Sequence, residues 1–253
     1  MKGWLSGQRS RPVDTAPAVP AGTRLYAVGD IHGCIDLLRE LSQLIHEDAY
    51  RRQAPRNVVV YLGDFIDRGP DSRGVIDMLL NEPLPGFESH HLKGNHEDIM
   101  LRFLADTSLG SSWLAFGGRE TLRSYGIDPP AANAPVAELQ RAQRELGLRM
   151  PRSHLDFLRR LETSHVEGDY FFAHAGVKPG VPLEQQRDED MLWIREEFLR
   201  SDASFGRIVV HGHSIVREPD VRRNRIGIDT GAFASNRLTA LVAEGTEWFF
   251  LQT

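Results

Sequence analysis

The fold of this sequence is decided by one stretch, Asn57-Val58-Val59-Val60-Tyr61-Leu62 followed at once by Gly63-Asp64-Phe65-Ile66-Asp67-Arg68-Gly69. The first part is a continuous apolar, β-branched run, which is typical of a strand buried on both faces of a parallel sheet. The second part changes to glycine, aspartate and arginine, so polar groups follow the carboxyl end of that strand. Ligands of open α/β sheets bind beyond this end of the strands. The stretch therefore predicts an α/β fold with a site at one edge of a sheet.

The same succession of strand and polar turn recurs along the chain. Short β-rich runs alternate with apolar stripes at helical spacing, for example Arg24 to Val28 before the helical pattern of Cys34 to Asp48. Polar turns follow five predicted strands: Gly29-Asp30-Ile31-His32-Gly33, Gly63 to Gly69, Gly94-Asn95-His96-Glu97, His174-Ala175-Gly176 and His211-Gly212-His213. Five strand ends that deliver Asp, Asn and His indicate one shared site.

The chain divides into a tail, one domain and an insertion. Residues 1–22 are rich in proline and small residues and predict a flexible tail. Residues 23–253 predict one domain, with a helical insertion at about 107–165. The insertion contains Trp113 but none of the strand-end polar groups, so we expect it to affect substrate choice more than chemistry. The last three strands, at 225–228, 238–243 and 248–251, are predicted to form a meander.

Composition narrows the class of protein. The 253 residues carry a net charge of −5, and 41% are hydrophobic, which excludes fibrous, fully disordered and disulfide-rich classes. The charge balance predicts neither a nucleic-acid duplex nor a membrane as partner. No apolar run approaches the ~18 residues of a membrane helix. Cys34 is the single cysteine and cannot form an internal disulfide, so we expect a cytoplasmic protein.

The strand-end residue types fit a pair of metal ions. Carboxylate, imidazole and amide oxygen together suit Mn, Fe or Zn rather than Ca. One aspartate can bridge two ions about 3.5–4 Å apart. A lone Gly-Asp such as Gly29-Asp30 is more often a helix cap, and isolated histidines are interpreted as packed or surface residues: His46, His90, His91, His154 and His165. Asp229-Thr230-Gly231 resembles half of an aspartic protease site and is rejected, because that chemistry needs two such carboxylates.

Five motifs in this order resemble those of the phosphoprotein phosphatase family of calcineurin-like metallophosphoesterases: Gly-Asp-Ile-His-Gly, Gly-Asp-Phe-Ile-Asp-Arg-Gly, Gly-Asn-His-Glu, His-Ala-Gly and Gly-His-Ser. The likeness spans Arg24 to Gly245. It is greatest to the bacterial and phage lambda type of protein phosphatase, and next to the symmetrical diadenosine tetraphosphate hydrolases. It implies an α/β fold of two packed mixed sheets flanked by helices.

The resemblance also implies a role for each site residue. Asp30 and His32 hold the first metal ion, Asp64 bridges, and the second ion is held by Asn95, His174 and His213. Two divalent ions are implied, Mn²⁺ foremost and Fe or Zn as alternatives, and they make hydroxide from water at neutral pH. Arg68 and Arg195 bind the phosphate, because planar guanidinium groups match phosphate oxygens. His96 protonates the leaving oxygen, and Asp67 orients its ring.

Two departures from the motifs of related families help to choose the branch of the family and the class of substrate. Many calcineurin-like enzymes carry Gly-His-x-His, but the second His is replaced here by Ile215, as in the phosphoprotein phosphatase branch. His211 precedes the glycine and is interpreted as packing or as a support of the ligands. The dinucleotide hydrolases continue Asp-Thr-Gly with Cys and Trp, whereas Ala232 and Phe233 follow here. The sequence therefore favours a serine/threonine or dual-specificity protein phosphatase, with a dinucleoside polyphosphate or nucleotide-cap hydrolase as the alternative.

Overall fold

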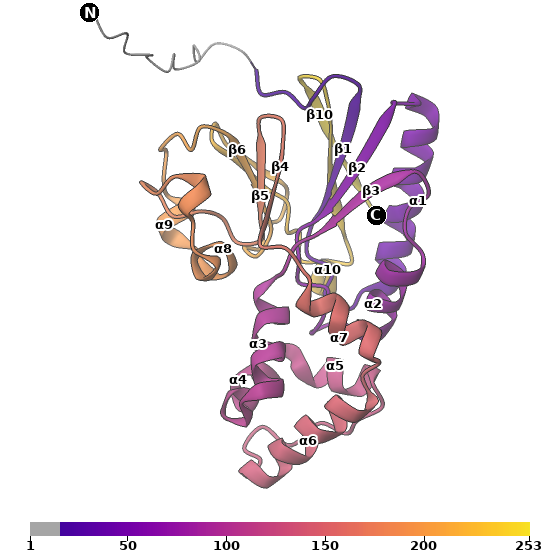
Figure 1. Cartoon of the computed structure of the whole chain (residues 1–253), viewed down its shortest axis with the longest axis vertical. Coiled ribbons are helices and arrows are strands. Elements are labelled where there is room, and N and C mark those ends of the chain that lie inside the picture. Colours follow the sequence, from indigo (N-terminus) through magenta and orange to yellow (C-terminus); the bar gives the residue numbers. More distant parts are fainter. Residues whose placement is uncertain (1–15) are drawn as a thin grey trace, which may run out of the picture.

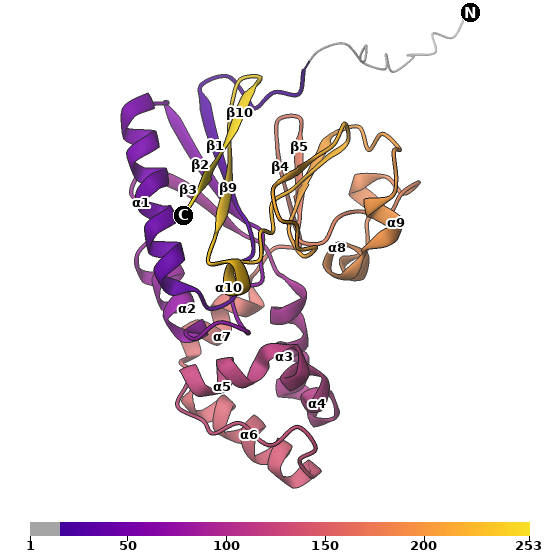
Figure 2. The same ribbon diagram turned by 180° about the vertical axis from the view of Figure 1, so that it is seen from behind.

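The computed structural model describes residues 16–253, which form two five-stranded mixed sheets packed against each other (Figures 1 and 2). The first sheet has the order β10-β9-β1-β2-β3. Its strands span Glu247–Gln252, Thr239–Glu244, Thr23–Val28, Arg56–Tyr61 and Phe87–His91. β1, β2 and β3 are parallel, and β9 is antiparallel to both β1 and β10.

The second sheet has the order β4-β5-β6-β8-β7. Its strands span Ser164–Glu167, Tyr170–Ala173, Ile208–His211, Arg225–Gly227 and Asp220–Val221. The three central strands are parallel, and both edge strands are antiparallel to their neighbours. The fold predicted from the sequence, two packed mixed sheets flanked by helices, is confirmed.

Both faces of the central strands β9, β1 and β2 are largely buried, which explains their mostly apolar sequences. In β1, Leu25 and Ala27 join a core shared with Phe172 and Val210 of the second sheet. Successive side chains of a strand point to opposite faces. Tyr26 and Val28 of β1 therefore join the other core, on the helical side of the sheet. There α1 (Ile35–Arg52) and α2 (Ser72–Asn81) cover the sheet (Figure 2). A third core lies between the second sheet and α8 (Asp188–Trp193) and α9 (Glu196–Leu199).

A helical segment connects β3 to β4 and extends from one end of the two sheets (Figure 1). Its elements are α3 (Asn95–Ala105), η1 (Thr107–Leu109), α4 (Gly110–Trp113), the π-helix η2 (Leu114–Gly118), α5 (Arg119–Ser124), α6 (Val136–Arg149) and α7 (Arg152–Arg159). Two short elements lie elsewhere, η3 (Leu183–Gln185) and α10 (Ala232–Ser235). The predicted insertion at 107–165 lies within this segment, except that its last two residues begin β4.

The predicted meander is wrong for its first strand. β8 pairs in parallel with β6 in the second sheet, and only β9 and β10 form an antiparallel hairpin in the first. The chain crosses between the sheets after β8. Three apolar runs in sequence give no sign of such a crossing, because burial looks the same in either sheet.

The predicted tail at 1–22 falls mostly on residues 1–15, which lie outside the described residues. The remainder packs against the domain. Val19 is buried and its N–H donates to the Gly245 carbonyl (3.0 Å), while the N–H of Ala18 donates to Asp169 Oδ2 (3.1 Å). None of the helices in the described part of the chain combines the length and apolar character that crossing a bilayer requires.

Candidate metal centre

The polar turns after the parallel strands of both sheets converge. The N–H of His32, after β1, donates to the Asp64 carbonyl after β2 (2.8 Å), and the N–H of Gly212, after β6, donates to the His174 carbonyl after β5 (2.8 Å). The two sheets are joined where the N–H of His213 donates to Asp30 Oδ2 (3.0 Å). The structure thus brings together the strand ends that the sequence predicted to share one site.

Three of the six predicted ligands have a left-handed backbone although they are not glycine: His32 (φ 47°), Asp64 (φ 51°) and His213 (φ 61°). This conformation is uncommon for residues with a Cβ, and such strain clusters at functional sites, where surrounding contacts maintain it. Here hydrogen bonds between the turns, and the carboxylate of Glu97 described below, supply those contacts.

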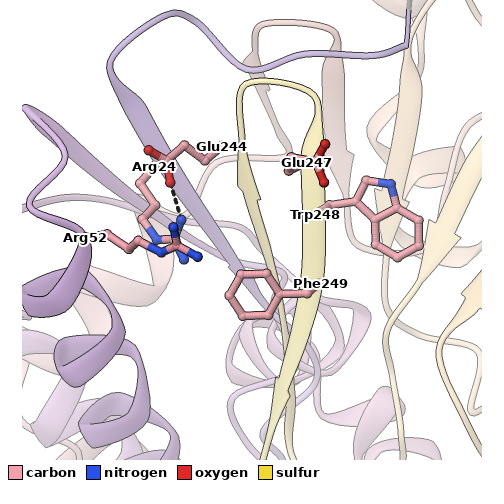
Figure 3. Close-up of a pocket in the computed structure, with 6 residues that line it drawn as sticks. All are labelled: Arg24, Arg52, Glu244, Glu247, Trp248 and Phe249. Carbon is pink, nitrogen blue, oxygen red and sulfur yellow. Dashed lines mark hydrogen bonds and ion pairs between the residues drawn. The ribbon is translucent and has the colours of Figure 1, made fainter.

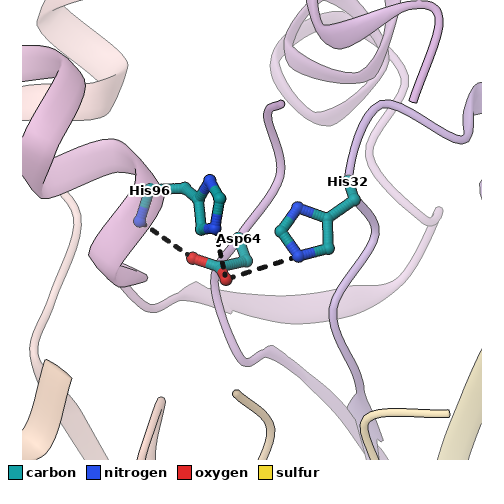
Figure 4. Close-up of side chains that lie close together, drawn as sticks. All are labelled: His32, Asp64 and His96. Atoms are coloured by element: carbon teal, nitrogen blue, oxygen red, sulfur yellow. Dashed lines mark hydrogen bonds and ion pairs between the residues drawn. The ribbon is translucent and has the colours of Figure 1, made fainter. Parts of the chain in front are cut away.

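Asp64 lies at the middle of the cluster (Figure 4). Its Oδ2 is 3.5 Å from His32 Nε2, and its Oδ1 is 3.4 Å from His174 Nε2. On one side Asn95 Oδ1 is 2.9 Å from His174 Nε2 and 2.8 Å from His213 Nδ1. Donor atoms of Asp64, His174 and His213 lie within 4.8 Å of one another, and so do those of Asp64, His32 and His96. The six predicted ligands are all buried: Asp30, His32, Asp64, Asn95, His174 and His213.

Two features of the cluster suit a bound cation. Asp30 Oδ1 and His213 Nε2 are buried without any hydrogen-bond partner in the described structure. A Cβ atom on Gly94 would overlap Asp64 Oδ1, and one on Gly212 would overlap Asp30 Oδ1, so glycine gives both carboxylates their room. Unpaired buried polar atoms are costly, and a metal ion would satisfy both of these. The mixed oxygen and nitrogen donor set fits divalent ions of the Mn, Fe or Zn kind.

The pKa shifts of Asp30 and His32 agree with a metal ion at this cluster. Burial, followed by repulsion from Asp229 and Asp64, raises the pKa of Asp30 well above its ordinary value. Burial lowers the pKa of His32 to about 3, so its imidazole is neutral at neutral pH, which is the form that binds metals. Repulsion from neighbouring carboxylates is one cause of the raised pKa of Asp30, and a divalent ion bound there would relieve it.

A histidine–aspartate pair lies beside the cluster. His96 Nδ1 is 2.7 Å from Asp67 Oδ2, and His96 Nε2 points back to Asp64 Oδ2 at 3.8 Å (Figure 4). Burial lowers the pKa of His96, but the charge of Asp64 and the hydrogen bond to Asp67 outweigh burial and raise it above its ordinary value. Asp67 also accepts hydrogen bonds from Trp113 Nε1 (3.0 Å) and Thr121 Oγ1 (2.5 Å). The pair is therefore held rigidly with one ring nitrogen facing the cluster.

The two predicted phosphate-binding arginines differ in their surroundings. Arg68 is half-buried, its Nη1 lies 2.9 Å from His32 Nε2, and its guanidinium lies 4.8 Å from the ring centre of Phe233. Arg195 is exposed at the start of α9, and its charge contributes to the lowered pKa values of His174 and His213, after burial and nearer charges. Both positive charges thus act on the cluster.

Sequence reasoning missed two acidic residues of this centre. The buried carboxylate of Glu97 accepts hydrogen bonds from the N–H groups of Asp64, Phe65, Ile66 and Gly94, and so shapes the turn after β2. Asp229 lies against Asp30; burial foremost raises its pKa to about 6, and its Oδ2 has no hydrogen-bond partner in the described structure. Asp229 follows β8, a parallel neighbour of β6, so the strand-end rule itself could have found it.

Three histidines outside the cluster pack against other side chains, which agrees with their interpretation from the sequence. His211 is buried with its ring edge-on to Phe198 (5.0 Å between ring centres). His91 stacks on Tyr61, and His154 contacts Tyr125 and Asp77.

A pocket of about 480 Å³ lies beside β1, β9, β10 and the end of α1 (Figure 3). It is lined by Arg24, Arg52, Glu244, Glu247, Trp248 and Phe249. Arg24 already forms ion pairs with Asp48 (2.7 Å) and Glu244, and none of the residues predicted for the site lies in this lining.

The chain matches the calcineurin-like phosphoesterase family over residues 23–232, which covers most of its length. The protein belongs to this family. It is accordingly an enzyme, a phosphoesterase, and membership implies divalent metal ions. A serine/threonine-protein phosphatase 1 of Salmonella typhimurium is 30% identical over 220 residues, covering 85% of this chain and 89% of that protein.

Other relatives are named bis(5'-nucleosyl)-tetraphosphatase instead of protein phosphatase. An asymmetrical bis(5'-nucleosyl)-tetraphosphatase of Oceanobacillus iheyensis is 27% identical over 240 residues, covering 86% of this chain and 87% of that protein. Among solved structures, a protein serine/threonine phosphatase from Saccharomyces cerevisiae superposes with a TM-score of 0.55 at 13% identity, covering 91% of this chain and 79% of that one. This likeness concerns the fold.

Proposed function

We propose that this phosphoesterase is a protein phosphatase with a two-ion centre that removes phosphate from serine or threonine, and also from tyrosine if its specificity is dual. The observation that carries the proposal is the convergence of the six buried donor residues around Asp64, beside the His96–Asp67 pair. The 30% identity to a serine/threonine phosphatase supports the choice of a phosphoprotein over other esters.

The ligands divide into two sets. Asp30 and His32 would hold one ion, Asn95, His174 and His213 the other, and Asp64 would contribute to both through its two oxygens. Two divalent ions bound there supply a nucleophile from water near neutral pH and polarise the phosphoryl group. Manganese is the preferred candidate, with Fe and Zn as alternatives.

Arg68 and Arg195 would bind the phosphate oxygens and stabilise their charge as the ester bond breaks. The lone pair of His32 Nε2 can accept the hydrogen bond from Arg68 or bind an ion, but not both. We therefore expect metal loading to release the Arg68 guanidinium and make it available to the phosphate.

His96 would donate its proton to the leaving oxygen. Nδ1 is fixed by Asp67, so the proton must leave from Nε2, the nitrogen that faces the cluster. Asp67 holds the tautomer and stabilises the protonated ring, in the manner of a triad carboxylate.

A second candidate, hydrolysis of a dinucleoside polyphosphate or nucleotide cap, is favoured by aromatic rings at the mouth of the centre. Phe116 is 44% exposed, and its ring centre is 6.3 Å from His96 and 6.4 Å from Trp193. Phe233 is 37% exposed and lies 5.3 Å from His32. Exposed aromatic faces beside a phosphate site can stack on a nucleobase, and several relatives are named bis(5'-nucleosyl)-tetraphosphatase.

One experiment separates the candidates. Rates on a phosphoserine peptide and on diadenosine tetraphosphate are measured side by side with Mn²⁺, using Asp64→Asn as the inactive control. Faster release of phosphate from the peptide supports the protein phosphatase. Faster cleavage of the dinucleotide, with a loss in Phe116→Ala that the peptide does not share, would establish the second candidate instead. The products tell symmetrical cleavage (two ADP) from asymmetrical cleavage (ATP and AMP).

A further inference from the structure

A second group of metal-binding side chains lies at the seam where the two sheets meet, and shares no residue with the centre described above. β3 is the edge strand of the first sheet and β4 that of the second. Backbone contacts join the two edges: the N–H of Lys93 donates to the Glu162 carbonyl (2.7 Å), and the N–H of Glu162 donates to the His91 carbonyl (3.0 Å). His90 on β3 and His165 on β4 consequently meet across the seam.

The donor atoms of this group are close together. One nitrogen of His90, one of His165 and one carboxylate oxygen of Glu162 all lie within 4.8 Å of one another. Two ligands of a tetrahedral zinc ion lie roughly 3.4 Å apart at zinc's bond lengths. His165 Nε2 is buried and has no hydrogen-bond partner in the described part of the chain. The group thus needs only small side-chain movements to become a three-residue site.

The charge around the seam favours a cation. Glu88 Oε1 is 3.2 Å from His90 Nε2, and Glu167 Oε2 is 3.7 Å from His165 Nε2, so with Glu162 three carboxylates face the two rings. Arg56 is the cation among them, 2.8 Å from both Glu88 and Glu167. Three negative charges against one positive charge leave an excess of negative charge. Burial, followed by His90, lowers the pKa of His165, which keeps its imidazole in the neutral, metal-binding form.

We propose that His90, Glu162 and His165 bind a divalent transition-metal ion of zinc's chemistry, which clips the edges of the two sheets together. Two imidazoles and one carboxylate are a ligand set that zinc takes with a water in its fourth position. The two rings now lie face to face, 3.6 Å between centres. A metal binds an imidazole in the plane of its ring, so one ring turns when the ion binds. The side chains of His90 (18% exposed) and Glu162 (49% exposed) are free enough to move.

The test counts zinc on the intact protein. Wild type, His165→Asn and Glu162→Ala are dialysed against the same micromolar concentration of free zinc, and bound zinc per chain is measured. We expect each variant to bind one ion fewer than wild type, because the active centre takes zinc equally in all of them. Hydrolysis of nitrophenyl phosphate with Mn²⁺ should be unchanged, since neither residue belongs to that centre.

A matched control fixes the interpretation. His46→Asn removes a histidine from the exposed face of α1, and this variant should bind as much zinc as wild type. Glu162→Ala changes a half-exposed side chain, so it remains informative if His165→Asn fails to fold. Equal zinc content in wild type and Glu162→Ala would overturn the proposal, as would an equal loss in His46→Asn.

Discussion

The indole N–H of Trp113 donates a 3.0 Å hydrogen bond to Asp67 Oδ2, the same oxygen that lies 2.7 Å from His96 Nδ1. Trp113 is fully buried and stacks on Phe103. The sequence led us to expect that this residue affects substrate choice, since it lies in the insertion. Its position connects the insertion to the proposed acid, so we infer that Trp113 also supports the chemistry.

Replacing Trp113 by Phe tests this connection, because Phe keeps the stacking and removes only the N–H. Asp67 then holds the His96 ring less firmly, and we expect a loss of about tenfold on a phosphoserine peptide, the lower end of the scale of one hydrogen bond to a charged group. Nitrophenyl phosphate, whose leaving group departs with little protonation, should lose less. Trp248→Phe on β10 is the control and should behave as wild type. Equal losses on both substrates would mean that Trp113 only stabilises the fold.

His96→Asn tests the acid itself. A general acid contributes about 10²–10⁴-fold, and most where the leaving group is poor. We expect a loss in that range on phosphoserine, and a much smaller loss on nitrophenyl phosphate. Asp67→Asn should show the same pattern more weakly, because it orients the ring and does not donate the proton. Metal content, measured in parallel, should stay near wild type. A variant that loses metal would instead place His96 among the ligands or their supports.

The metals are tested by removal. A chelator should abolish activity and Mn²⁺ should restore it, since the proposed mechanism takes its nucleophile from the two ions. Asp64→Asn should bind less metal than any other ligand variant, because its two oxygens face both halves of the cluster. Metal analysis after dialysis measures this directly. Turnover that persists in the chelated enzyme would remove the two-ion centre from the mechanism.

The arginines are tested by inhibition with free phosphate. Arg68→Ala and Arg195→Ala should weaken that inhibition and slow turnover while leaving metal content near normal. Arg195→Lys should recover only part of the activity, because an ammonium cannot form the two parallel hydrogen bonds of a guanidinium. Arg200→Ala, in the exposed turn after α9, is the control. An Arg195→Ala enzyme that phosphate inhibits as strongly as wild type would lie outside the phosphate site.

The sequence predicted the α/β fold and the convergence of the polar turns because both depend on local rules, whereas the set of six ligands came from the resemblance to a family. An apolar strand followed by a polar turn is visible within ten residues, and parallel strands bring such turns to one edge. Trp113 and Asp67 are 46 positions apart, so only the folded insertion brings them into contact. Glu97 carries no predicted role, since nothing local shows that its carboxylate accepts three backbone N–H groups of the turn after β2 besides that of Gly94 in its own turn.

Asp229 was missed for a different reason, because it was compared with a protease motif and not with the other strand ends. Its carboxylate lies against that of Asp30, and the repulsion between these buried acids contributes to the raised pKa of Asp30. A cation bound by Asp30 gains from a second negative charge beside it.

Asp229→Asn removes that charge and keeps the shape, so we expect metal affinity to fall by about tenfold, which corresponds to roughly 1.4 kcal/mol. Titration of the metal-free protein with Mn²⁺, followed by calorimetry, measures the affinity without recourse to activity. Asp36→Asn is the control, because the Asp36 side chain is 94% exposed on the first turn of α1. An Asp229→Asn protein that binds Mn²⁺ as tightly as wild type would leave Asp229 a purely structural residue, which holds the turn through the Gly231 N–H at 2.9 Å.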